Sequence, residues 1–128
     1  MSKTRLNEIR EPEARKALAE AVLALLEQWQ LHPVNQAALL GLDDIASIKG
    51  GEPLPMDDEV SERTAHLLAI GRALNRLFPY QPERRSAWVA ENNAVLDGAT
   101  PLQWMLGGLE QMRTLHEMLE PGSGTTQE

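Results

Sequence analysis

The stretch Ala87–Leu106, AWVAENNAVLDGATPLQWML, decides how this chain folds. A tryptophan-bearing helix runs into a polar break, and a tight turn follows at Asp97-Gly98. Thr100 and Gln103 then have the spacing of a capping box, and Pro101 fits the first position of a helix. We therefore expect a helix, a turn and a newly started helix, on which the other helices of the chain pack.

Apolar residues recur every three or four positions on both sides of this stretch, a spacing that predicts amphipathic helices. Turn residues divide the pattern into helices at 13–30, 33–40, 44–49, 57–78, 83–91, 101–106 and 109–119. No segment alternates with period two for long enough to make a strand. The sequence predicts an all-α fold, a compact bundle of about six or seven helices.

Composition and terminal segments divide the chain into four parts. Residues 1–11 are charged with few apolar anchors and predict a flexible arm. Residues 12–56 form a helix-turn-helix-like region centred on Gly41, and residues 57–120 form a second helical unit. The tail 121–128, PGSGTTQE, has no apolar residue and is expected to be flexible.

The charge balance and the cysteine count exclude several classes of function. The chain has 128 residues, a formal net charge of −7 and no cysteine. Disulfides, thiolate metal sites and cysteine nucleophiles are therefore absent, and an acidic field repels phosphate backbones. The N-terminus lacks the apolar core of a signal peptide, and no apolar run reaches the length of a membrane span. We expect a cytoplasmic protein that has no contact with membranes.

The large apolar side chains predict where the core lies. Trp29 and Trp88 occur at helical spacing and are expected to be core residues. Leu102, Met105 and Leu106 are the expected buried residues of the helix at 101–106. Trp104 lies beside them in a helix too short to turn every large side chain inward, so both a core role and a surface role stay open for it.

No catalytic set can be assembled from the sequence, so we expect a protein that is not an enzyme and needs neither a cofactor nor a metal. His32, His66 and His116 stand far apart, and solvated or capping roles are expected for them. The pairs Asp43-Asp44 and Asp57-Asp58 lie at the starts of predicted helices, where a carboxylate accepts hydrogen bonds from free backbone amides.

The helix-turn-helix outline gives a candidate DNA-binding surface. A helix that reads the major groove needs hydrogen-bond donors, and the helix after the turn offers Ser47 and Lys49 beside two aspartates. Lys3 and Arg5 of the N-terminal arm are candidates for phosphate contacts. A DNA-binding unit and a purely structural helical hairpin both remain open.

The segment from about Leu39 to Leu119 resembles the Xre/MbcA/ParS-type antitoxins, whose helical toxin-binding domain follows an Xre-like helix-turn-helix region. The most specific part of the resemblance lies within Trp88–Leu106. Its carriers are Ala38-Leu39-Leu40-Gly41-Leu42, Pro53-Leu54, Glu62-Arg63, Leu67-Leu68, Leu74, Trp88, Asn92-Asn93, Leu96, Gly98, Thr100-Pro101-Leu102, Leu106 and Gly108. Where family members often have a tryptophan or arginine in the third helix of the DNA-binding unit, this chain has Asp44, Ile45 and Lys49.

This resemblance implies a function in a type II toxin–antitoxin system. Such antitoxins bind and neutralise a RES-type, NAD-degrading toxin encoded beside them, and the implied toxin-binding domain is 57–120. The resemblance further implies that the last helix docks on the toxin and that the terminal segment helps to block its NAD pocket. The candidate toxin-binding residues are Trp104, Met112, Arg113, His116, Glu120 and Glu128.

The implied partners are the cognate toxin and operator DNA, with assembly as a homodimer or as a hetero-oligomer with the toxin. The alternative function is a DNA-binding transcriptional regulator that acts through the helix-turn-helix.

Overall fold

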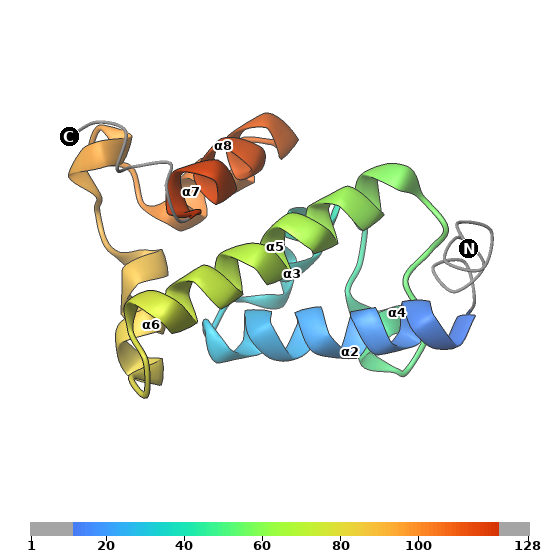
Figure 1. Ribbon diagram of the computed structural model, residues 1–128. Coiled ribbons are helices and arrows are strands. Elements are labelled where there is room, and N and C mark those ends of the chain that lie inside the picture. Colours follow the sequence, from blue (N-terminus) through green and yellow to red (C-terminus); the bar gives the residue numbers. More distant parts are fainter. Residues whose placement is uncertain (1–11, 121–128) are drawn as a thin grey trace, which may run out of the picture.

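Seven α-helices and one short 3-10 helix form the part of the chain that the structure describes (Figure 1). The computed structural model describes residues 12–120. The elements are α2 (Pro12–Gln28), α3 (Pro33–Leu40), α4 (Ala46–Lys49), α5 (Asp58–Leu77), α6 (Pro82–Ala90), η1 (Ala94–Leu96), α7 (Pro101–Leu106) and α8 (Leu109–Leu119). No strand occurs within residues 12–120, so the predicted all-α bundle is confirmed.

The longest helix, α5, lies at the centre of the arrangement. Its first turn is capped by Asp57, whose Oδ1 accepts hydrogen bonds from the backbone amides of Glu59 (2.9 Å) and Val60 (3.1 Å). The helices α2 and α3 pack against α5, and α8 packs against it on the side away from α2 (Figure 1). The C-terminal helix therefore rests on the same central helix as the N-terminal half.

One hydrophobic core joins both halves of the chain. Every described helix contributes buried residues to it, and the fully buried large side chains include Leu26, Leu39, Leu40, Leu67, Ile70, Leu74, Met105, Met112 and Leu115. Residues of the predicted helix-turn-helix region and of the predicted toxin-binding domain thus share a single core. The arm 1–11 and the tail 121–128 lie outside the described residues.

The turn between α3 and α4 follows the predicted outline, but two helix boundaries in the N-terminal half differ from the prediction. Gly41 ends α3 with φ of 78°, a left-handed conformation that glycine adopts without strain. The next helix was expected over 44–49 but begins at Ala46, because Asp44 Oδ1 accepts a hydrogen bond from the Ala46 amide (2.8 Å) and caps the turn there. The helix expected over 13–30 ends at Gln28, before Gln30, whose φ is 62°.

The stretch Ala87–Leu106 folds as expected. Helix α6 ends at Ala90, η1 follows, and Asp97 and Gly98 turn the chain with φ of 59° and 89°. Both hydrogen bonds of the capping box are present, from the Thr100 amide to Gln103 Oε1 (2.9 Å) and from the Gln103 amide to Thr100 Oγ1 (3.0 Å). This loop fixes the start of α7 and, through α7, the position of α8.

The core predictions hold for most of the large side chains. Trp29 is buried, whereas Trp88 and Trp104 are half-buried and packed against the core. Met105 is buried, but Leu106 is 38% exposed, so its predicted burial is wrong. A helix of six residues turns one side to the core, and Leu106 falls at its outer edge beside the Gly107 end.

Candidate functional site

Helix α8 is the helix on which the predicted partner-binding residues concentrate. Its apolar residues Met112 and Leu115 are 0% and 1% exposed and face the core that α5 and α7 provide. The exposed side of the helix carries Glu110, Thr114 and Glu117. Helix α8 therefore has an inner side held by the rest of the chain and an outer side available to a partner.

A group of charged and titratable side chains joins α8 to α5 along one edge of their contact. This α5–α8 polar cluster consists of Glu62 and His66 on α5, Arg113 and His116 on α8, and Glu120 at the end of α8. All five side chains are partly exposed, with relative accessibilities between 14% and 44%. The cluster lies beside the hydrophobic contact between α5 and α8, not within it, and adds polar interactions that hold α8 on α5.

The shortest ion pair of the cluster joins Arg113 to Glu62. Arg113 Nη2 donates to Glu62 Oε2 (2.6 Å), and its Nη1 donates to Glu110 Oε1 (3.0 Å). The hydrogen bonds from Arg113 and His66 hold the pKa of the Glu62 carboxyl below its usual value of 4.5, and the same contact raises the pKa of Arg113. The folded state then resists protonation of Glu62 more than the unfolded chain does. Its contribution to stability is present above pH 4.5 and is lost as the pH falls through the lower folded-state pKa.

The two histidines of the cluster contact each other. His66 Nδ1 lies 2.8 Å from His116 Nδ1, and the rings meet edge to face with centroids 5.0 Å apart. On the far side of each ring, His66 Nε2 lies 3.4 Å from Glu62 Oε2 and His116 Nε2 lies 2.7 Å from Glu120 Oε2. A chain of hydrogen-bonding groups thus crosses from one helix to the other.

Sequence reasoning missed this histidine pair. The expected capping role is confirmed for His32, whose Nδ1 accepts a hydrogen bond from the Val34 amide (3.1 Å). For His66 and His116 the expectation of solvated rings is wrong. The only signal was local: each histidine has a glutamate four residues away on its own helix, but nothing in the sequence shows that the two rings meet.

Of the predicted toxin-binding residues that the structure describes, one lies in the core, and the others lie at the edge of α8, at its end and on α7. Met112 lies in the core, and Arg113 and His116 are engaged with α5. Glu120 accepts a hydrogen bond from His116, and Trp104 is half-buried, with its Nε1 among the buried polar atoms that have no hydrogen-bond partner. Glu128 lies outside the described residues.

The predicted DNA-binding residues lie on a very short helix. Helix α4 has four residues, in which Ile48 is buried and Ser47 and Lys49 are exposed. Lys49 Nζ lies 3.9 Å from Glu27 Oε2, an ion pair that occupies its charge in part. Lys3 and Arg5 fall outside the described residues. The described part of this unit offers few donors for base edges or phosphates.

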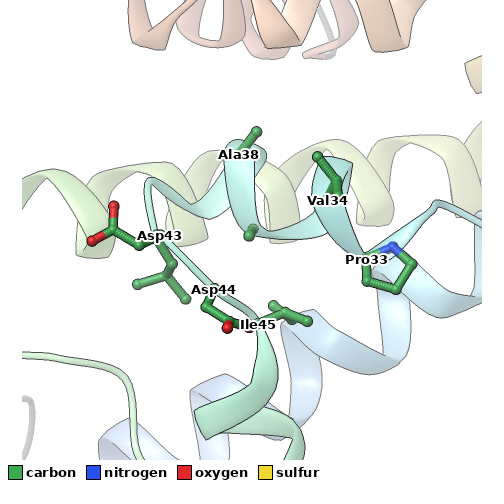
Figure 2. A pocket seen from close by; sticks show the side chains of 8 residues that line it. Pro33, Val34, Ala38, Asp43, Asp44 and Ile45 are labelled. Atoms are coloured by element: carbon green, nitrogen blue, oxygen red, sulfur yellow. The ribbon is translucent and has the colours of Figure 1, made fainter.

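A shallow groove of about 520 Å³ opens between α3 and the start of α4 (Figure 2). Val34 and Ala38 line it from α3, and Asp43, Asp44 and Ile45 line it from the following turn. The full lining is Pro33, Val34, Ala37, Ala38, Leu42, Asp43, Asp44 and Ile45. Its two carboxylates repel phosphate, so the groove is unsuited to a nucleic-acid backbone.

Within residues 12–120, no group of three or more histidine, cysteine, aspartate or glutamate side chains is arranged to hold a metal ion. Among the described helices, none combines the length and the apolar character that crossing a membrane requires.

Comparison with known proteins places the chain in a family. No family model matches it. The uncharacterized protein y4oB of Sinorhizobium fredii is 36% identical over 93 residues, which cover 70% of each of the two chains. The chain belongs to the y4oB family. No activity is attached to the name of y4oB, so membership of the y4oB family brings no function with it, and function is argued from the residues of this chain.

Proposed function

We propose that this protein is the antitoxin of a type II toxin–antitoxin system, a cytoplasmic protein without enzymatic activity that binds and neutralises a RES-type, NAD-degrading toxin. The support comes first from the resemblance of Leu39–Leu119 to the Xre/MbcA/ParS-type antitoxins. The structural observation that best supports the proposal is the loop within Trp88–Leu106, the most specific part of that resemblance. Several motif residues of this loop form hydrogen bonds with one another.

Asn93 organises this loop. Its amide donates to the Ala99 carbonyl (3.0 Å), and its carbonyl accepts hydrogen bonds from the amides of Leu96 (3.0 Å) and Gly98 (2.9 Å). Its side-chain Oδ1 accepts from the Val95 amide (2.9 Å). A motif with this many internal bonds forms a rigid support for the helices that follow it.

Neutralisation of an enzyme needs a surface that excludes its substrate and no catalytic group of its own. Helix α8 is amphipathic and covers the core with one side, which leaves its outer side for the toxin. We propose that this end of the chain covers the NAD pocket. The complex forms with the toxin as a hetero-oligomer, with homodimerisation of the antitoxin as a further contact.

The direct test is expression of the neighbouring gene product in cells with and without this chain. We expect the neighbouring product to stop growth alone, and co-expression of this chain to restore growth with the two proteins purifying together. A product that is harmless alone would contradict the proposal, as would a product that stays toxic while bound to this chain. Measurement of cellular NAD in the same cultures reports the toxin activity independently of growth.

A second candidate function is that of a DNA-binding transcriptional regulator. It is favoured by the Gly41-centred turn between α3 and α4, which has the outline of a helix-turn-helix. The acidic groove beside that turn and the ion pair of Lys49 with Glu27 oppose it.

A mobility-shift assay with the DNA upstream of the chain's own gene distinguishes a transcriptional regulator from an antitoxin that does not bind DNA. We expect at most weak binding that salt abolishes and that shows no sequence preference. A salt-tolerant shift that is specific for one sequence and is lost in Lys49→Ala would establish the regulator instead. The substitution Lys16→Ala, on the exposed side of α2, removes the same charge elsewhere and serves as the control.

A further inference from the structure

The contact between His66 and His116 needs a hydrogen between two ring nitrogens. The two Nδ1 atoms lie 2.8 Å apart, a distance at which a hydrogen must lie between them. The side chains are 14% and 24% exposed, so water has limited access to replace that hydrogen bond. The question is therefore which nitrogen supplies the hydrogen.

The carboxylates at the outer ends of the pair restrict the answer. Glu120 Oε2 lies 2.7 Å from His116 Nε2, and Glu62 Oε2 lies 3.4 Å from His66 Nε2. An ionised carboxylate only accepts hydrogen bonds, so each Nε2 must carry a hydrogen. A neutral imidazole has one N–H, and two neutral rings would then turn bare lone pairs toward each other. The pair needs one additional proton, which gives three hydrogens on four ring nitrogens.

The surrounding charges favour that additional proton. Glu62 and Glu120 bring two negative charges to the outer ends of the pair and Arg113 brings one positive charge beside Glu62, so a positive charge on the histidine pair is favoured. Glu110 and Glu117, on the exposed side of α8, add negative potential near Arg113. The other helices packed nearby, α3 and α7, carry no charged side chain, and α2 lies across α5 from α8 (Figure 1).

A metal ion does not fill the same role. Two Nδ1 atoms make an incomplete set for a tetrahedral ion, and the described residues contain no group of three suitable ligands. A proton between the Nδ1 atoms of His66 and His116 needs no further ligand and fits their separation.

We propose that His66 and His116 form a proton-binding site that fastens α8 to α5 when the pair holds one shared proton. As the pH rises and this proton leaves, two lone pairs face each other and the bond is lost. As the pH falls and a second proton adds, two imidazolium ions face each other and repel. The attachment of α8 is therefore strongest at an intermediate pH and weaker on both sides. This property belongs to the isolated chain and does not depend on the proposed antitoxin function.

The test is nitrogen-15 NMR of the histidine rings in the full chain between about pH 4 and about pH 9, the range over which imidazoles titrate. We expect His66 and His116 to share one proton over an intermediate range and to titrate in two separated steps. His32 lies outside the pair and serves as the internal reference. A single simple step for all three histidines would overturn the proposal.

Hydrogen exchange of the α8 amides measures the attachment itself. We expect protection factors, corrected for the intrinsic effect of pH, to pass through a maximum and to fall about tenfold on either side of it. Protection that changes in one direction only would contradict the proposal. So would a stoichiometric response of the ring resonances to added Zn²⁺, because a metal would then be the occupant.

Two substitutions change the proton requirement without removing the pair's hydrogen bond. In Glu120→Gln, the amide can donate to His116 Nε2, so neutral His116 can carry its hydrogen on Nδ1 and bond to His66. In His116→Asn, the amide bonds to His66 without titrating. Both variants are expected to keep α8 protected at high pH, where the unaltered chain loses protection. The control Glu117→Gln removes the same charge on the exposed side of α8 and should leave the maximum in place.

Discussion

Replacing Met112 with alanine is expected to lower the free energy of unfolding by about 2 to 5 kcal/mol. The Met112 side chain is 0% exposed and belongs to the core that joins α8 to the rest of the bundle. Alanine leaves a cavity there. The protein loses the favourable free energy of transferring the removed atoms out of water, and it loses the packing contacts that those atoms made. Urea denaturation followed by tryptophan fluorescence measures the change.

A second methionine on the same helix supplies the matched control. Met118 is 38% exposed, so Met118→Ala removes the same atoms from a site that is only partly buried. We expect a loss of less than about 1 kcal/mol, as for most substitutions near the surface. Met112→Leu conserves volume and is expected to cost less than about 1.5 kcal/mol. Equal effects of Met112→Ala and Met118→Ala would show that α8 is not held by its inner side.

The sequence predicted the features of this fold that depend on neighbouring residues. The capping box of Thr100 and Gln103 and the left-handed end of α3 at Gly41 lie where their spacing placed them, and the cap of α5 is Asp57, one member of the pair Asp57-Asp58. Each is a hydrogen bond or a backbone conformation within a few residues, and residue chemistry fixes such features locally. Helix boundaries were less well predicted, as Asp44 shows by delaying the start of α4 through its bond to Ala46.

The features that the sequence did not reveal depend on contacts between distant segments. His66 and His116 are fifty positions apart, and their meeting is set by how α8 packs on α5. For the same reason Met112 and Arg113, taken from the resemblance as toxin-binding candidates, lie in the core and in an ion pair with Glu62. Helical spacing shows which residues share one side of a helix, but not which helix covers that side.

Under the proposed function, the exposed side of α8 is the surface that meets the toxin, and reversing its charge is expected to weaken binding strongly. Thr114 and Glu117 are exposed neighbours on that side. Because the chain carries a net charge of −7, we expect the facing toxin surface to be positive. The double variant Thr114→Arg with Glu117→Arg places two cations against it. We expect the affinity for the purified toxin, measured by isothermal titration calorimetry, to fall by about 100-fold.

The control for this double variant lies on α2. Ala17 and Glu20 are exposed, have the same spacing of three, and undergo the same change in charge in Ala17→Arg with Glu20→Arg. Net charge alone would weaken both variants equally through long-range attraction, and salt would screen that part of the effect. A loss confined to the α8 variant, and retained at high salt, requires direct contact between α8 and the toxin. Equal losses would move the binding surface away from α8 while leaving the antitoxin function itself to the growth assay.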